Sequence, residues 1–194
     1  MARWEPNASQ RLSDAALELF AERGYENTTV QDIAQRAGLA KSSFFRHFKD
    51  KRDVLFGEDA LLEPLLAGIA AAPPQAGPLQ AMGYALDAVG QEVFISERRS
   101  AVARRRTVID AHPDLREREG LKSMSLTAAL SAAMERRGAP GLLAEVSAHL
   151  GILALKMAYE RWTEPENTDG FAVVARQAIT EVEEAISAVR SRAR

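Results

Sequence analysis

The chain has 194 residues, and its formal net charge at pH 7 is only −2. Hydrophobic residues make up 46% and charged residues 27%, a balance that excludes a disordered chain and is typical of a folded globular protein. The absence of cysteine excludes disulfides, cysteine nucleophiles and cysteine-ligated zinc. The start of the sequence has no signal-peptide pattern, and the longest uncharged run, residues 64–86, contains four prolines, so we expect a cytoplasmic protein with no membrane partner.

The first predicted helix covers residues 9–23. Its apolar residues recur at i, i+3, i+4, i+7 and i+8, which is typical of an amphipathic helix with one buried stripe. Gly24 follows in the position where a left-handed residue commonly ends a helix. We therefore expect this helix to end there and to pack on its neighbours.

Two short helices are predicted next. Thr29 is expected to cap helix 30–37, with Asp32 three residues later in a capping box that has aspartate in place of glutamate. Gly38 ends this helix, and a third helix of about two turns ends near His47. Two short helices joined by a tight turn that begins with glycine form the helix-turn-helix pattern, whose second helix enters the major groove of DNA.

The segment GLAKSSFFRHFKDKRDVL, residues 38–55, combines three phenylalanines with a basic surface. Helical spacing predicts that Phe44 and Phe48 face the core. The residues expected to project outward are Lys41, Ser42, Ser43, Phe45 and His47. Phosphate contacts act within about 8–10 Å, so a local basic patch is sufficient for DNA binding. A solvated charged face is the alternative interpretation.

The rest of the sequence is helical in pattern, with breaks at proline and glycine. No strand is expected, because the sequence has no sustained alternation of apolar and polar residues. The fold class predicted is all-α with about nine helices, the later ones at 51–71, 77–95, 97–111, 114–137, 141–163 and 169–191.

Residues 12–56 resemble the TetR family of bacterial transcriptional regulators through the pattern GY..TTV.DIA..AG...S..F.HF..K..L. The resemblance implies a three-helix helix-turn-helix DNA-binding domain at residues 1–55 and a helical ligand-binding and dimerisation domain at 56–194. It also implies a homodimeric repressor, with no cofactor and no metal, that binds a palindromic operator in double-stranded DNA and is released by a small apolar or amphipathic effector. The protein would then lie on the bacterial nucleoid while bound to DNA.

Residues that match the family's motif are expected to make the DNA contacts that the family makes. The resemblance implies contacts from Thr29, Gln31, Lys41, Ser42, Ser43, Phe45, His47 and Lys51. Lys51 is expected at the N-terminus of helix 51–71, where the helix dipole favours a phosphate. Phe45 stands where the family usually has tyrosine, so it keeps the flat apolar contact but has no hydroxyl for a phosphate oxygen.

The last two helices are expected to pair across the dimer in a four-helix bundle. The residues expected at this interface are Leu150, Met157, Ile179, Val182, Ile186 and Val189. Those in the last helix repeat at intervals of three and four, a seam that would be unpaired in a monomer. The segment ALKMAYERWTEPEN resembles a subgroup of the family that binds acyl-CoA-like ligands, so the effector is expected to be acyl-CoA-like or otherwise lipophilic.

A ligand pocket is the least constrained expectation. The candidate lining residues are Tyr84, Phe94, Arg105, His112, Met124 and Met157. Arginines near mid-chain could hold an anionic effector, or they could form interhelical ion pairs with Glu92, Glu97 or Asp110. The methionines and aromatic residues fit a helical core equally well. His112 and His149 are too far apart in sequence to indicate a metal site.

Two other classes of protein compete with a regulator. A helical enzyme or a small-molecule binding protein without a DNA role is the first, although the sequence has neither a Gly-rich phosphate loop nor a G-x-S-x-G motif. A protein of the membrane surface is the second, and residues 60–72 are its only candidate segment. We therefore expect a DNA-binding regulator and not an enzyme.

Overall fold

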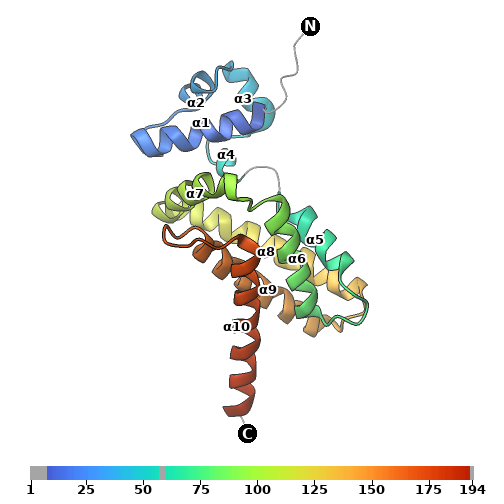
Figure 1. The fold of residues 1–194 in the computed structure, drawn as a ribbon. Coiled ribbons are helices and arrows are strands. Elements are labelled where there is room, and N and C mark those ends of the chain that lie inside the picture. The colour runs from blue at the N-terminus through green and yellow to red at the C-terminus, as the bar shows by residue number, and fades with distance from the viewer. Residues whose placement is uncertain (1–7, 57–59, 193–194) are drawn as a thin grey trace. The chain divides into compact units, whose positions relative to one another are not determined.

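The computed structural model describes residues 8–56 and 60–192 (Figure 1). All regular structure within these ranges is helical, as predicted. The elements are α1 (Ala8–Arg23), α2 (Val30–Arg36), α3 (Lys41–His47), α4 (Asp53–Phe56), α5 (Leu62–Ala71), α6 (Pro78–Glu92), the short 3₁₀ helix η1 (Ser96–Arg98), α7 (Arg99–Ala111), α8 (Pro113–Arg136), α9 (Gly141–Trp162) and α10 (Phe171–Arg192).

One expected helix is divided. The prediction of a continuous helix over 51–71 is wrong, because α4 ends at Phe56 and α5 begins at Leu62, after a turn at residues 60 and 61. Pro64 explains the new start: inside a continuous helix it could not donate to the carbonyl of residue 60, whereas the first turn of a helix tolerates proline. The described residues therefore form ten α-helices where about nine were expected.

The described residues divide into two compact units. The first contains α1 to α4 together with residues 101–119, which are most of α7 and the start of α8. Its core takes apolar side chains from each of these helices, including Leu12 of α1, Phe44 of α3 and Leu115 of α8, all fully buried. The helix-turn-helix region therefore shares one core with a segment that lies far from it in the sequence.

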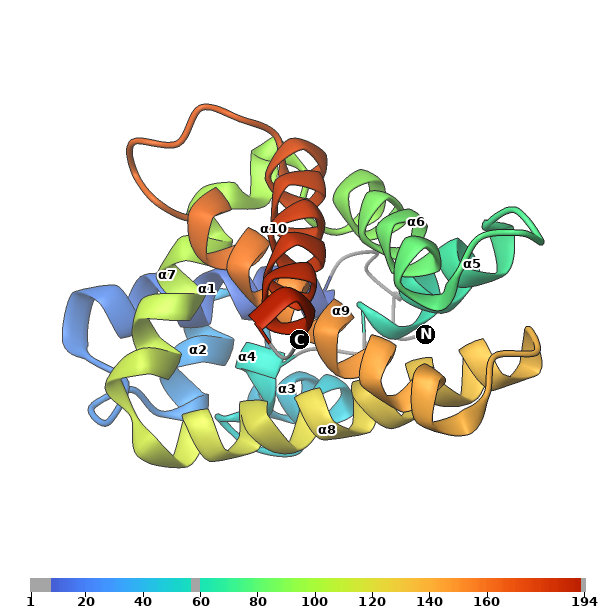
Figure 2. The same cartoon turned by 90° about the horizontal axis from the view of Figure 1, so that it is seen from below.

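The second unit contains residues 60–100 and 120–192, and α6 packs against α5, α9 and α10 in it (Figure 2). Gly68 of α5 faces the backbone of α6. A Cβ atom at position 68 would lie 2.5 Å from the Cα of Ala85 and 2.5 Å from the carbonyl oxygen of Tyr84. Glycine at this position therefore allows the two helix backbones to approach each other closely.

Aromatic and charged contacts attach α10 to the rest of the second unit. The ring of Phe94 lies 4.4 Å from that of Phe171 and 5.5 Å from that of Trp162, measured between centroids. Arg161 of α9 donates two hydrogen bonds of 2.6 Å to Glu181 of α10. These hydrogen bonds hold the pKa of the Glu181 carboxyl below its usual value.

One described helix, α9, is long and apolar enough to cross a membrane, judged by length and composition alone. Core helices of soluble proteins meet the same criteria. Ala148, Leu155 and Trp162 of α9 are buried within its own unit. Packing in this unit therefore accounts for much of the apolar character of α9.

Candidate nucleic-acid interface

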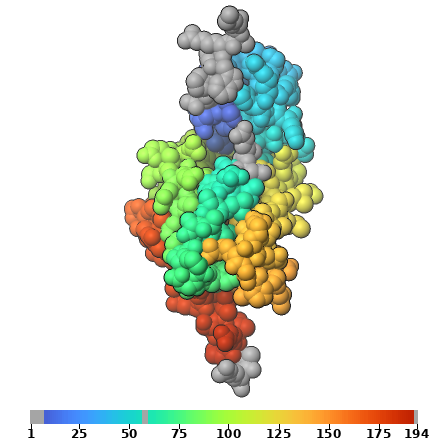
Figure 3. Space-filling model, turned by 90° about the vertical axis from the view of Figure 1, so that its right-hand side faces the viewer, coloured from blue at the N-terminus to red at the C-terminus, as the bar shows by residue number. Residues whose placement is uncertain are grey.

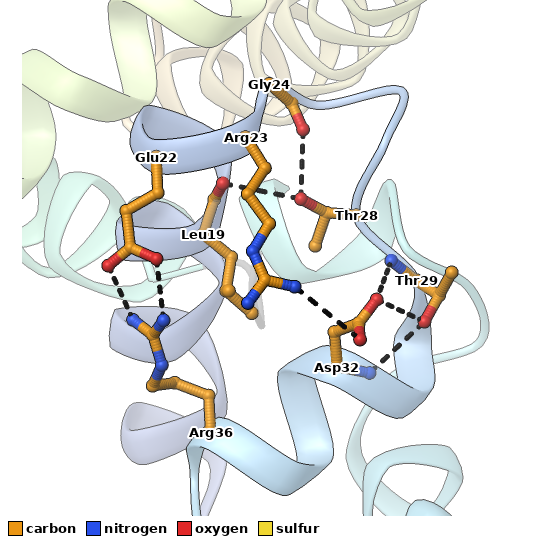
Figure 4. Close-up of polar contacts among 8 residues, drawn as sticks. All are labelled: Leu19, Glu22, Arg23, Gly24, Thr28, Thr29, Asp32 and Arg36. Carbon is orange, nitrogen blue, oxygen red and sulfur yellow. Dashed lines mark hydrogen bonds and ion pairs between the residues drawn. The ribbon is translucent and has the colours of Figure 1, made fainter.

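Two threonines shape the junction between α1 and α2 (Figure 4). Gly24 follows α1 with φ of +82°, as expected for the residue that ends the helix. The buried Thr28 hydroxyl donates a hydrogen bond of 2.9 Å to the Gly24 carbonyl. Thr29 is in the extended conformation of an N-cap, with φ −103° and ψ 159°. The predicted start of the second helix is confirmed.

The Thr29 side chain is bound to Asp32 (Figure 4). Its hydroxyl donates to Asp32 Oδ2 at 2.6 Å and accepts from the Asp32 backbone N–H at 3.2 Å, and the Thr29 N–H donates to the same carboxylate at 2.9 Å. Hydrogen bonds from the Thr29 hydroxyl and then from its backbone lower the pKa of Asp32. The capping box is confirmed, and the Thr29 hydroxyl proton is directed to a carboxylate of the chain itself.

Ion pairs hold the end of α2 against α1. Arg36 donates to both oxygens of Glu22, at 2.9 and 2.6 Å (Figure 4). It also donates to Glu18 at 3.2 Å. The hydrogen bond from Arg36 is the main cause of the lowered pKa of Glu22. These pairs are exposed, so their role is to fix the orientation of α2 more than to add stability.

The turn between α2 and α3 depends on Gly38, whose φ of +68° lies in the left-handed region. Arg11 of α1 reaches this turn and donates to the carbonyl of Ala37, the last residue before the glycine. A Cβ atom at position 38 would lie 3.1 Å from the Arg11 guanidinium. The backbone conformation and the neighbouring arginine therefore both favour glycine here.

Helix α3 has two different faces, as its sequence predicts. Phe44 is completely buried and Phe48, just after the helix, is 3% exposed, whereas Phe45 is 52% exposed. The other exposed side chains of α3 are Lys41, Ser42, Arg46 and His47. The core therefore fixes α3 through phenylalanine, while a basic surface with one aromatic ring faces solvent.

Ser43 corrects the predicted outward set, because it is buried with 9% exposure. In a helix, residue 43 lies about 100° from Phe44, at the edge of the buried face. The Ser43 hydroxyl accepts a hydrogen bond of 2.9 Å from the Arg46 guanidinium, one turn later. Ser43 therefore orients Arg46 and is not itself presented to solvent.

Lys51 is not at the N-terminus of a helix, which corrects a second expectation. Helix α4 begins at Asp53, whose N–H donates to the Asp50 carboxylate at 2.8 Å. The Lys51 ammonium donates to the carbonyl of Tyr25 at 2.7 Å and lies 4.2 Å from the centroid of its ring. It thereby ties the loop before α4 to the α1–α2 junction.

Three exposed basic residues of the segment 38–55 are absent from the predicted set of contacts: Arg46, Lys49 and Arg52, the last of which pairs with Asp50. The family pattern gives no residue type at these positions. Gln31, in the first turn of α2, and Thr29 are also exposed. The described surface around α3 is therefore broader than the predicted one.

The six candidate pocket residues are divided between the two units. Arg105 and His112 belong to the first unit, and the other four belong to the second. Phe94 is buried among aromatic rings, and Met124 is 70% exposed. In the first unit, Arg105 pairs with Glu119 at 3.2 Å, and His112 Nδ1 lies 3.6 Å from Glu26. Arg106 pairs with Asp110 one turn later in the same helix, α7, and not between helices as expected.

Two shallow hollows lie at the turns between α5 and α6 and between α8 and α9, whose surfaces are adjacent in Figure 3. Their volumes are about 240 and 360 Å³, and they share Ala76. Tyr84 is the one candidate pocket residue that lines either of them. Arg137, beside the first, donates to the carbonyls of Ile69, Ala72 and Pro73, so it caps α5.

The apolar surface of the last two helices differs from the predicted seam. Ile179 and Val182 are buried within their own subunit, at 9% and 4% exposure, so the expectation that they would be unpaired in a monomer is wrong. Helix α9 instead presents an exposed or half-buried apolar row. Its members, at intervals of three and four residues, are Leu143, Val146, Leu150, Leu153 and Met157. We call this row the α9 face.

Helices α2 and α3 have the geometry of a helix-turn-helix motif: the core fixes both of them, and the second presents an exposed basic surface. Residues 12–57 match the model of the tetR family of bacterial regulatory proteins. The regulator TcmR of Streptomyces glaucescens is 45% identical over 80 residues, and AcrR of Shigella flexneri is 43% identical over 49. Over these residues the chain is similar to TetR family transcriptional regulators.

The sequence matches are confined to part of each protein. They cover 41% of this chain and 35% of TcmR, and 25% of this chain and 22% of AcrR. The chain thus spans about a third or less of the length of these curated relatives.

Solved structures resemble the chain over most of its length. The TetR-family regulator PfmR from Thermus thermophilus is 26% identical with a TM-score of 0.51, covering 89% of this chain and 96% of PfmR. The fatty acid degradation regulator FadR from Bacillus halodurans has a TM-score of 0.61 and covers 93% of this chain and 96% of FadR. At 14% identity, this second likeness shows a shared fold alone.

Proposed function

We propose that this protein is a ligand-responsive transcriptional repressor that binds a palindromic operator as a homodimer. The observation that carries the proposal is the exposed surface of α3, with Lys41, Phe45, Arg46 and His47 on a helix whose other face is anchored by Phe44. Residues 1–55 would form the DNA-binding domain, and residues 56–194 the ligand-binding and dimerisation domain.

The proposed DNA contacts divide by chemistry. Lys41, Ser42 and Phe45 lie where base edges are within reach of a recognition helix, and the Phe45 ring suits a thymine methyl group. His47, Arg46 and Lys49 offer donors to phosphate oxygens. Ser43 would act by orienting Arg46. The Thr29 hydroxyl donates to Asp32, and the Lys51 ammonium donates to the Tyr25 carbonyl. These two residues would contact phosphate only by redirecting those donors.

The proposed dimer uses the α9 face together with Ile186 and Val189 of α10. Val189 is 71% exposed, and Leu143, Val146 and Leu153 of α9 are each between 45% and 47% exposed. An apolar row of heptad spacing on a long helix is stabilised by pairing with a second such row. A two-fold dimer would present its two recognition helices about 34–36 Å apart, one turn of DNA.

The proposed effector is an apolar or amphipathic small molecule, with acyl-CoA-like compounds as the first class to test. The support is the resemblance of residues 154–167 to the acyl-CoA-binding subgroup. Binding would release DNA only if the effector has a higher affinity for a form of the dimer whose recognition helices are wrongly spaced. We place the protein in the bacterial cytoplasm, on the nucleoid while it is bound to DNA.

Selection from genomic DNA tests the proposal. The purified protein is incubated with sheared DNA of its source organism, and bound fragments are recovered and sequenced. Recovery of a few fragments that share one palindrome is the expected result. If folded, dimeric protein recovers nothing above background, with and without acyl-CoA compounds, the proposed function is wrong.

A further inference from the structure

Arg118, near the start of α8, contacts the carboxylates of Asp50, in the loop that joins α3 to α4, and of Asp53, the first residue of α4. Its guanidinium donates a hydrogen bond of 2.5 Å to Asp53 and lies 3.9 Å from Asp50. The Arg118 and Asp53 side chains are only 30% and 19% exposed, so water screens this pair incompletely. All three residues belong to the first unit, although Arg118 is 65 residues from Asp53 in the sequence.

The same carboxylates hold the backbone of the loop. Asp53 accepts a hydrogen bond of 3.0 Å from the backbone N–H of Lys49, and Asp50 accepts from the N–H of Asp53 at 2.8 Å. Arg52 donates to the other oxygen of Asp50 at 3.1 Å. The loop that carries Lys49 and Lys51 is therefore built around two acids, and Arg118 is the cation brought to them from outside the helix-turn-helix.

Burial alone would raise the pKa of Asp50. Hydrogen bonds from Asp53 and Arg52, together with the positive charges of Arg52 and Arg118, outweigh this effect and lower it. Asp50 is therefore expected to be ionised at neutral pH. Without Arg118, the negative charge of the carboxylates would stand beside groups proposed to meet phosphate.

Helix α4 itself is held at both ends. It has only four residues, too few to be stable alone. Arg118 binds Asp53 at its first position, and Arg105 of α7 donates a hydrogen bond of 2.5 Å to the Leu55 carbonyl near its end. Both guanidiniums also lie over the ring of Phe56, at 5.3 and 5.4 Å from its centroid. Side chains from α7 and α8 thus fix the segment that follows the recognition helix.

We propose that Arg118 is a positioning residue of the DNA interface: through Asp53 and Asp50 it holds the α3–α4 loop and neutralises its negative charge, so that Lys49 and Lys51 meet phosphate groups. The inference rests on the proposed function. It assigns part of the interface to a helix outside the helix-turn-helix motif. Because the loop carries phosphate-binding groups, Arg118 acts on affinity for all DNA sequences and not on preference among them.

The test is a double-mutant cycle on the full-length dimer with the variants Arg118→Ala, Asp53→Asn and the two combined. Affinity is measured for a duplex that carries the recovered palindrome and for a random-sequence duplex. Arg118→Ala is expected to weaken binding to both about tenfold. In the Asp53→Asn background, where the carboxylate is already neutral, the same change is expected to have an effect within about twofold.

Three controls separate this role from a general effect on folding. Arg136→Ala changes the same residue type at an exposed position of the same helix and is expected to leave affinity unchanged. Arg118→Lys keeps the charge but not the two-pronged geometry, so it is expected to bind DNA with an affinity between those of the wild type and Arg118→Ala. If the alanine variant unfolds, the affinity of Arg118→Lys tests the proposal in its place. Thermal unfolding of each variant without DNA identifies any that has lost its fold.

Two outcomes would overturn the proposal. One is unchanged affinity in both Arg118→Ala and Arg118→Lys, and the other is an equal loss from Arg118→Ala in the presence and absence of the Asp53 carboxylate. If the wild-type protein itself binds neither duplex, the proposed function fails instead, so the two failures are distinguishable.

Discussion

At the scale of single residues, the polar atoms of the predicted interface are divided between the protein and the solvent. The Thr29 hydroxyl donates to Asp32, the Ser43 hydroxyl accepts from Arg46, and the Lys51 ammonium donates to the Tyr25 carbonyl. These three residues therefore build the surface. The exposed side chains of α3 and of Lys49, in the loop that follows, are free to contact DNA under the proposed function.

Substitution of His47 and of Lys41 should have different consequences. His47→Ala removes a proposed phosphate contact, so we expect weaker binding to specific and random duplexes alike, with the salt slope smaller in magnitude by about 1. Lys41→Ala removes a proposed base contact, so we expect a loss of about 1–3 kcal/mol for the recovered palindrome and little change for random DNA. Titrations on both duplexes measure this, and equal effects of the two variants on both duplexes would refute the division of roles.

The Asp32 carboxylate should make stability depend on pH. Hydrogen bonds from Thr29 lower its pKa in the folded state, so its contribution is present above the unfolded pKa of about 3.9 and is lost as pH falls through the lower folded value. We expect the wild-type Tm to fall more steeply than that of Asp32→Asn between about pH 5 and pH 2. Thermal unfolding at a series of pH values gives the comparison, and parallel curves would show that the capping box has no such role.

At the scale of helices, close packing in the second unit depends on where side chains are absent. Gly68 permits the backbones of α5 and α6 to meet, whereas Gly83 on α6 has nothing within 4 Å of where its Cβ would lie. The two glycines therefore have opposite roles although both lie inside helices. Position 68 requires glycine for space, and position 83 does not.

Alanine at each of these glycines distinguishes the two roles. Gly68→Ala forces a methyl group to within 2.5 Å of the α6 backbone, so we expect a loss of about 1–3 kcal/mol in the free energy of unfolding. Gly83→Ala fills open space in a helix and is expected to stabilise the protein by up to about 1 kcal/mol. Urea unfolding of both variants measures the changes. A Gly68→Ala variant as stable as the wild type would show that α5 and α6 separate at little cost.

Helical periodicity was sufficient to predict local features of the fold but not distant ones. Phe44 is fully buried and the adjacent Phe45 is 52% exposed, because 100° of helical rotation places the two side chains on different faces. The pair of Arg118 and Asp53 has no local signal, because a charged residue on a helix face is usually solvated. Ile179 and Val182 have the heptad spacing of an interface, but α10 packs this face inside its own subunit.

At the scale of the whole molecule, the proposal requires two copies of the chain. The α9 face gives a row of apolar side chains for this purpose, and one of its members, Leu153, is 47% exposed. Its heptad spacing is visible in the sequence, but whether such a row lies on the surface depends on how its helix packs. Two recognition helices, each on its own subunit, would together read a palindrome.

A charge placed on the α9 face should therefore dissociate the dimer. We expect Leu153→Asp to yield a folded monomer, because a carboxylate without a partner is costly to bury at an interface, and to weaken operator binding strongly. Met124→Asp on α8, where the side chain is 70% exposed, is the control and should remain dimeric. Light scattering after gel filtration gives the mass of each variant. A Leu153→Asp variant that stays dimeric would locate the interface elsewhere.

The salt dependence of binding to the recovered palindrome tests the central claim most directly. If each subunit neutralises about four phosphates, eight in the dimer, log K should fall against log salt with a slope of about −7. The affinity of the full-length dimer is measured by titration over a range of salt concentrations. A slope of about −7 is the result that a DNA interface around α3 predicts, and a slope close to zero would contradict it.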